Sequence, residues 1–212
     1  MASIAILGSG RMGQALAEGL AGAGHEVTVG SRDPGASADK FKESGVRVAS
    51  VEEALAASDV IINATPGETS LERLKGLRDQ LDDKVLIDVS NATVRGPTGA
   101  PGGLVYPNGS LAEELHQALP ETKVVKTLNN VLFMVMTNPG SLSSPPTAFI
   151  SGDYESAKET TRQLLNDLGW ADEQVLDLGD ITTARGTEAL ILMVFPFVMA
   201  KGMMPFAVTV VT

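Results

Sequence analysis

The sequence predicts an α/β fold, in which a doubly wound, mostly parallel sheet is completed by a small helical cap at the C-terminus. Three observations predict it. Short apolar runs alternate with segments whose apolar residues recur at helical spacing, the first apolar run breaks into the glycine pattern GSGRMG, and no repeat or low-complexity linker divides the 212 residues. Strands that alternate with helices form parallel sheets covered on both faces. We therefore expect a single domain.

The alternation is regular over about residues 1–130, which we expect to form the core of the fold. Strands are indicated by continuous apolar runs, and helices by periodicity and by end signals. Gly24 is a natural helix end, and Ser50 with Glu53 has the spacing of a capping box. The expected strands are 3–8, 26–30, 46–49, 59–66, 84–90 and 122–129, and the expected helices are 11–24, 36–44, 50–58, 70–81 and 110–119.

The alternation of strands and helices becomes less regular over about residues 131–212, which we expect to complete and cap the same domain. A loop rich in Ser and Pro precedes the strand-like AFISG (148–152). A periodic segment at 153–169 predicts a helix, and QVLDLG (174–179) predicts another strand.

The C-terminal stretch 189–211 is apolar and carries a single charge, Lys201. A span of about 20 apolar residues raises the question of a membrane helix. Pro196, Lys201, Gly202 and Pro205 interrupt this one, so we expect a buried helix of about a dozen residues followed by a strand. Because an exposed patch of this size would aggregate, we also expect a homodimer with the stretch near the interface.

Charge and composition exclude several classes of partner. The formal net charge is -10 and the pI is about 4.6, which disfavours nucleic acid and anionic membranes. Cysteine is absent and only two histidines occur, so we expect no thiolate chemistry and no metal site. The N-terminus has no basic segment before a short apolar run, which predicts a cytoplasmic protein.

The glycine pattern indicates nucleotide binding. Gly8, Gly10 and Gly13 lie between the first expected strand and helix with GxGxxG spacing. In a strand–turn–helix unit the first glycine allows a tight turn, the second lets a pyrophosphate approach the backbone, and the third lets helix and strand pack closely. Free backbone N–H groups at the helix start then face the phosphates. The fold is therefore expected to be Rossmann-like.

The end of the second strand predicts NADP rather than NAD. An Asp or Glu there accepts hydrogen bonds from the ribose of NAD, whereas an arginine suits a 2′-phosphate. This chain has Ser31 and Arg32, a hydroxyl and a planar fork of donors. The alternative is that Arg32 is a solvated loop charge and that Asp33 contacts the ribose.

Three more strands end in polar or rigid residues at the same expected edge of the sheet, where ligands of such sheets collect. Ala64, Thr65 and Pro66 follow the fourth strand, and they would form a wall beside the cofactor. Ser90 with Asn91, and Asn129, end the next two strands. Loop capping accounts for these last three as well as a binding site does.

Other signals predict packing instead of a site. Tyr154 and Lys158 have the Tyr-x-x-x-Lys spacing of short-chain dehydrogenases, but that class has a different glycine pattern at its first turn. His25 follows a helix-ending glycine, and His116 is expected on a solvated helix face. The methionines near the C-terminus are expected to pack in the core or an interface.

The motifs AILGSGRMG, AGHEVTVGSR, KTLN, FISGD and LGDITTARGTEALI with KGMM together resemble the NADP oxidoreductases that use the deazaflavin coenzyme F420. They are also similar to the cytosolic domain of the six-transmembrane metalloreductases, which pass electrons from NADPH to a flavin. The resemblance spans nearly the whole chain. It implies an enzyme that transfers a hydride between NADP(H) and coenzyme F420 or a flavin.

The resemblance also implies roles for individual residues. The pyrophosphate would be held by Ser9, Gly10, Arg11 and Met12, and the 2′-phosphate by Ser31 and Arg32. Thr65 and Pro66 would border the nicotinamide, and the loop after Asn129 would support its amide. Gly202 and Met203 would line the ring of the second cofactor.

No single residue is expected to be catalytic, because hydride transfer between stacked rings gains mostly from holding the two carbons about 3 to 3.5 Å apart. Two alternatives remain. One is a small imine or carbonyl reductase, although 212 residues leave little room for the helical second domain of those enzymes. The other is a non-enzymatic NADP(H) sensor whose apolar tail docks on a partner.

Overall fold

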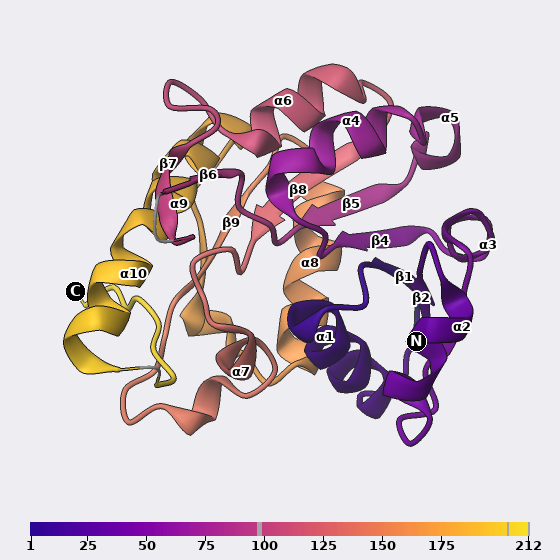
Figure 1. Ribbon diagram of the computed structural model, residues 1–212, viewed down its shortest axis with the longest axis horizontal. Coiled ribbons are helices and arrows are strands. Elements are labelled where there is room, and N and C mark those ends of the chain that lie inside the picture. Colours follow the sequence, from indigo (N-terminus) through magenta and orange to yellow (C-terminus); the bar gives the residue numbers. More distant parts are fainter. Residues whose placement is uncertain (97–98, 203, 212) are drawn as a thin grey trace.

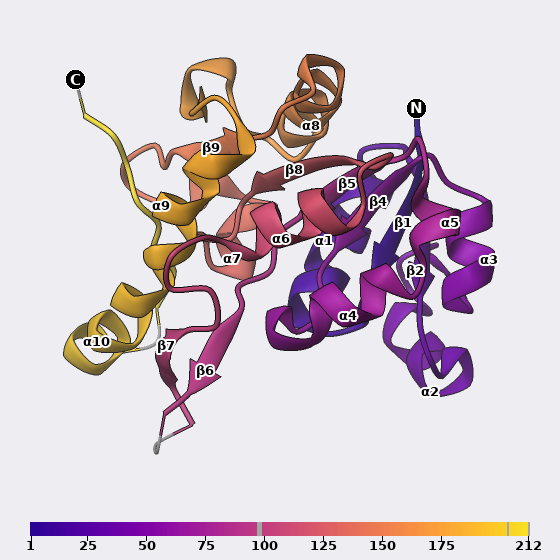
Figure 2. The ribbon, with the colours of Figure 1, turned by 90° about the horizontal axis from the view of Figure 1, so that it is seen from above.

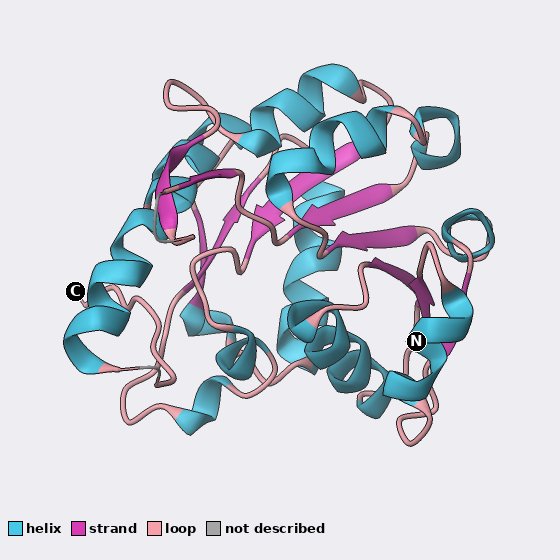
Figure 3. Ribbon diagram, in the orientation of Figure 1, coloured by secondary structure: helices cyan, strands magenta, loops and turns pink. Residues whose placement is uncertain are grey.

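The computed structural model describes residues 1–96, 99–202 and 204–211, and its centre is one eight-stranded sheet (Figures 1 and 3). The strand order is β10-β9-β8-β5-β4-β1-β2-β3, and every neighbouring pair is parallel except β8 with β9. The expected α/β architecture is confirmed. The strands of this sheet are β1 (Ser3–Leu7), β2 (Glu26–Gly30), β3 (Arg47–Ala49), β4 (Val60–Asn63), β5 (Val85–Asp88), β8 (Lys123–Thr127), β9 (Ala148–Ser151) and β10 (Val175–Asp177).

Helices cover both faces of the sheet. The α-helices are α1 (Arg11–Gly22), α2 (Pro34–Ala38), α3 (Val51–Ala56), α4 (Ser70–Lys75), α5 (Arg78–Leu81), α6 (Leu111–Ala118), α7 (Phe133–Met136), α8 (Glu155–Asp167), α9 (Ala184–Ala189) and α10 (Ile191–Lys201). One apolar cluster packs α1, α7 and α8 against one face of the sheet. A second cluster packs the helices α3, α4, α5, α6 and α9 against the other face. Because both faces are covered, the strands are continuous apolar runs in the sequence.

Several boundaries differ from the expected ones. The helix expected at 70–81 is two short helices, α4 and α5, separated at Gly76 and Leu77. The helix expected at 36–44 is α2 followed by a single 3-10 turn, Asp39–Phe41. An antiparallel hairpin of β6 (Thr93–Arg95) and β7 (Pro101–Leu104) occurs where no element was expected, and it projects from one end of the molecule beside α10 (Figure 2).

The C-terminal segment corrects two expectations. No residue of α10 is buried, and Met193 and Met199 are 63% and 70% exposed. The expectation of a buried helix is therefore wrong, because α10 lies at the end of the molecule, beyond the last helical layer (Figure 1). It is exposed although it is apolar on all sides. The run 204–211 forms no strand. It makes isolated contacts instead, such as the Thr147 N–H donating to the Val208 carbonyl at 2.9 Å.

By length and composition alone, the helical stretch Ile181–Lys201 could cross a membrane. Core helices of globular proteins pass the same test. Pro196, which was expected to interrupt the stretch, lies inside α10, whereas the helix ends before Gly202.

A buried ion cluster ties the C-terminal helices to the sheet. Lys126 on β8 is 1% exposed, and its Nζ lies 2.8 Å from both Asp88 Oδ2 and Glu188 Oε1. Burial alone would lower the pKa of Lys126, but the two carboxylates raise it above its ordinary value. Glu188 of α9 also accepts hydrogen bonds from the backbone N–H groups of Leu111 and Ala112 at the start of α6. The cluster therefore joins β5, β8, α6 and α9.

Lys126→Met should destabilise the protein by about 3–5 kcal/mol, because it leaves two buried carboxylates without their cation. Urea unfolding followed by circular dichroism measures the change. Lys123→Met on the same strand, where the ammonium group is exposed, is the control and should cost less than about 0.5 kcal/mol. Equal stability of the two variants would contradict the account of the cluster.

Candidate functional site

A cavity of about 820 Å³ lies at the carboxyl ends of the central strands, where the order reverses between β1 and β4. Ligands of open α/β sheets bind in this crevice. All the residues predicted to bind the dinucleotide line it except Gly13. These are Gly8, Ser9, Gly10, Arg11, Met12, Ser31, Arg32, Ala64, Thr65, Pro66, Asn91 and Asn129.

The three glycines of the first turn have different surroundings. A Cβ on Gly13 would lie 1.9 Å from the Gly8 carbonyl oxygen, so only glycine lets α1 pack this close to β1. Gly8 has φ +113°, and a Cβ there would meet the Ala64 carbonyl oxygen at 2.8 Å. A Cβ on Gly10 would have nothing within 4 Å. Gly10 thus keeps open a space that the fold itself does not need.

The start of α1 is open to this space. Gly10 is its N-cap and offers no side chain, the first turn contains no acidic residue, and the first intrahelical bond runs from Gln14 N–H to the Gly10 carbonyl at 2.8 Å. The N–H groups of Arg11, Met12 and Gly13 therefore have no partner within the helix. Such a helix start attracts anions through its donors and its dipole.

Hydroxyl groups connect the glycine turn to the end of β2. Ser31 Oγ lies 2.8 Å from Ser37 Oγ, which in turn donates to Ser9 Oγ at 3.1 Å. Asp33 is also beside the cavity, but its Oδ1 accepts a hydrogen bond from the Ala36 N–H and caps α2. Arg32 is exposed on the cavity wall. The geometry thus gives Asp33 a structural role and leaves Arg32 available to a ligand.

The loop after β4 is fixed by buried polar groups. Thr65 Oγ1 donates to Asn63 Oδ1 at 2.6 Å, and Asn63 Nδ2 donates to Asp88 Oδ1 at 2.8 Å. Asp88 belongs to the ion cluster of Lys126, so the cluster also positions this wall of the cavity. A Cβ on Gly67 would lie 2.3 Å from the backbone of Asn91, which shows how tightly the loops after β4 and β5 pack.

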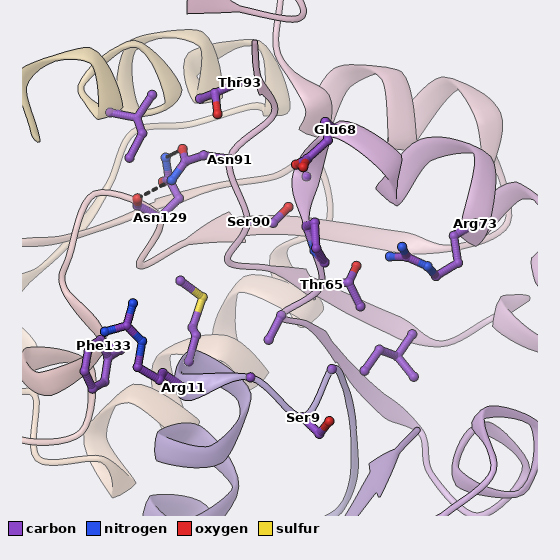
Figure 4. A pocket seen from close by; sticks show the side chains of 18 of the residues that line it. Ser9, Arg11, Thr65, Glu68, Arg73, Ser90, Asn91, Thr93, Asn129 and Phe133 are labelled. Carbon is purple, nitrogen blue, oxygen red and sulfur yellow. Dashed lines mark hydrogen bonds between the residues drawn. The ribbon is translucent and has the colours of Figure 1, made fainter. Parts of the chain in front are cut away.

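Asn91 and Asn129 are joined by two hydrogen bonds in the wall of the cavity (Figure 4). Asn91 Nδ2 donates to the Asn129 carbonyl at 2.6 Å, and Asn129 Nδ2 donates to Asn91 Oδ1 at 2.9 Å. Leu128, the residue before Asn129, has a left-handed backbone with φ +55°. This conformation costs about 1–3 kcal/mol in a non-glycine residue and often occurs at functional sites. The sequence gives no signal for it.

The sequence interpretation missed two arginines of the cavity. Arg73 on α4 and Arg95 on β6 line it together with Arg11 and Arg32, beside the carboxylates Asp33 and Glu68. Figure 4 shows the guanidinium of Arg73 reaching toward Thr65 and the cavity. Burial, and then the charge of Arg32, lower the pKa of Arg73. The position of Arg73 on the helix that follows β4 is the signal that could have identified it.

The other end of the cavity is apolar. Ile191 and Val194 of α10 and Phe206 line it, and the guanidinium of Arg11 lies 5.2 Å from the centre of the Phe133 ring. Val194 and Phe206 also line a second cavity of about 310 Å³. Gly202 is the exposed C-cap of α10 and does not line either cavity, and Met203 lies outside the described residues. Their predicted contact with a second cofactor stays a prediction.

The discounted signals lie away from the cavity. Lys158 pairs with Glu155 and Asp177, and Tyr154 is the N-cap of α8. His25 Nε2 lies 3.0 Å from Asp167 Oδ2, and His116 Nε2 lies 3.7 Å from Asp153 Oδ2. The contacts of both histidines and of Lys158 with Asp177 join different elements of the fold, whereas Glu155 lies on α8 with Lys158. His116, expected on a solvated helix face, is half-buried.

Comparison with known proteins gives a consistent set of relatives. Residues 3–92 match the family model described as NADP oxidoreductase, coenzyme F420-dependent. An F420-dependent NADP reductase of Methanothermobacter thermautotrophicus is 30% identical over 206 residues, which cover 88% of this chain and 85% of the relative. The metalloreductase STEAP3 of Rattus norvegicus is 34% identical over 193 residues, which cover 91% of this chain but 37% of that protein's length.

A solved structure agrees over the full length. The crystal structure of a candidate F420-dependent NADP reductase from an Arthrobacter species superposes with a TM-score of 0.93 and is 34% identical, and the match covers 100% of each chain.

Gly10→Ala and Gly13→Ala should separate ligand binding from folding. Gly10 has φ -79°, which alanine adopts freely, so this variant should keep its thermal midpoint but lose at least about tenfold in NADPH affinity. Gly13→Ala should lower stability by about 1–3 kcal/mol or more because of overpacking. Fluorescence titration and thermal unfolding measure the two effects. A Gly10→Ala protein that binds NADPH normally would contradict the assigned phosphate site.

Proposed function

Because this chain belongs to the family of coenzyme F420-dependent NADP oxidoreductases, and is an NADP-dependent oxidoreductase, we propose that it transfers a hydride directly between NADPH and a deazaflavin or flavin. One observation carries the proposal. A single cavity joins the open start of α1 and the arginine-lined end of β2 to an apolar wall formed by α10 and Phe206. It therefore has one end suited to phosphates and another suited to a flat ring.

The residues present fit NADP(H). The N–H groups at the start of α1 are free to bind the pyrophosphate, and the empty space beside Gly10 admits it. Ser31 and Arg32 would hold the 2′-phosphate, while Thr65, Pro66 and the paired Asn91 and Asn129 would border the nicotinamide. When bound, NADPH supplies the hydride.

The contribution of the protein is orientation. The walls of the cavity are held by hydrogen bonds and by the Lys126 cluster, so their positions are set before a ligand enters. Ile191, Val194 and Phe206 offer an apolar surface that excludes water from one end. Placing two reactants in a fixed geometry can contribute about 7–11 kcal/mol to the barrier reduction. The proposed reaction therefore needs no acid or base from a side chain.

Oxidised F420 or FMN mixed with NADPH and the enzyme should lose its absorbance under anaerobic conditions. Val194→Asp places a charge in the apolar end, so it should lower kcat/KM for the acceptor at least about tenfold while the Kd for NADPH stays unchanged. Val194→Leu is the matched control and should retain activity. NADPH binding without oxidation by either acceptor would instead indicate a sensor and overturn the proposal.

We also propose that the protein is a cytoplasmic homodimer with α10 at the interface. The exposed apolar side chains of α10 would then be covered by the second copy. Sedimentation in detergent-free buffer should give twice the 22.1 kDa mass of one chain. Met199→Asp should shift the protein to one-chain mass, because it puts a charge into the contact. A wild-type protein of one-chain mass, or one that needs detergent, would contradict this arrangement.

A further inference from the structure

Two arginines on different elements of the fold line the same cavity. Arg32 extends from the loop after β2, and Arg73 extends from α4 into the same cavity. Within residues 1–96, 99–202 and 204–211, neither arginine forms a salt bridge.

The positive charges of Arg32 and Arg73 repel each other. Partial burial lowers the pKa of Arg73, and the charge of Arg32 lowers it further, which is the sign of like-charge repulsion. Glu68 acts in the opposite direction, but its carboxylate lies toward Arg95, with Glu68 Oε1 4.0 Å from Arg95 Nη2. A ligand with two negative charges would relieve the repulsion.

The contacts of Arg73 leave part of its donor set unused. Nη2 donates to Thr69 Oγ1 at 2.7 Å, which fixes the guanidinium relative to α4. Nη1 is buried and has no hydrogen-bond partner. Buried donors in native proteins are nearly always satisfied, so an orphaned donor beside a binding cavity indicates a missing acceptor.

We propose that Arg73 is a specificity-determining residue that binds the 2′-phosphate of NADP(H) together with Arg32, the two guanidinium groups approaching the dianion from β2 and from α4. This inference rests on the proposed NADP(H) site. It adds a second cation, from a different element of the fold, to the pair Ser31 and Arg32. Arginine suits this position because its planar fork can bind two phosphate oxygens at once.

The test uses two adenosine nucleotides that differ only in the 2′-phosphate, 2′,5′-ADP and 5′-AMP, with calorimetric titration of the full chain. Arg73→Gln should weaken 2′,5′-ADP at least about tenfold, the loss expected for a hydrogen bond to a charged group, and change 5′-AMP less than about twofold. Arg73→Lys should keep part of the affinity. Arg78→Gln, at an exposed arginine on α5 outside the cavity, is the matched control and should change neither.

A double-mutant cycle with Arg32→Ala tests the shared ligand. If both arginines bind one phosphate, the loss in 2′,5′-ADP affinity in the double variant should differ from the sum of the single losses. Equal weakening of both nucleotides by Arg73→Gln would assign Arg73 to the adenine or to the fold and overturn the proposal. No weakening of 2′,5′-ADP would overturn it as well.

These binding measurements test the role of Arg73 whether or not the protein transfers a hydride. A protein that binds 2′,5′-ADP through Arg73 but does not oxidise NADPH keeps this inference and loses the proposed activity. A wild-type protein that binds the two nucleotides equally loses the 2′-phosphate site altogether, and with it the role of Arg73.

Discussion

The contact between Gly13 and the Gly8 carbonyl is the constraint on which the rest of the site depends. It holds α1 against β1 at a distance that no side chain would permit, and so it points the open helix start into the crevice between β1 and β4. The groups that we propose to bind phosphate are arranged around that start. Ser9 follows Gly8, Ser31 reaches it through a chain of hydroxyl groups, and the arginines lie on the surrounding wall.

The opposite end of the cavity depends on a long-range connection. Glu188 couples α9 to Lys126 and Asp88, and α10 follows α9 directly, so the apolar wall is tied to the same strands that carry the polar wall. A buried cluster of this kind contributes little net stability when intact, but removing one member is costly. The contribution of the cluster is therefore to position α9, and the C-terminal segment that follows it, relative to the sheet.

Much of this arrangement was predictable because it is local. Apolar runs gave the strands, and the glycine spacing gave the first turn, since both follow from steric rules within a few residues. The antiparallel placement of β9 and the hairpin β6–β7 depend on pairing between segments, which periodicity does not encode. The left-handed Leu128 and the position of Arg73 follow from tertiary contacts. The exposure of α10 was misjudged because a helix that is apolar on all sides is usually buried.

The central claim is that this cavity recognises NADP(H) through the start of α1 and a cationic wall. A crystal structure of the protein with bound NADP⁺ tests it most directly. The account predicts the pyrophosphate against the N–H groups of Arg11 and Met12, and the 2′-phosphate within hydrogen-bonding distance of Ser31, Arg32 and Arg73. A dinucleotide bound elsewhere, or a 2′-phosphate in solvent with both guanidinium groups turned away, would contradict it.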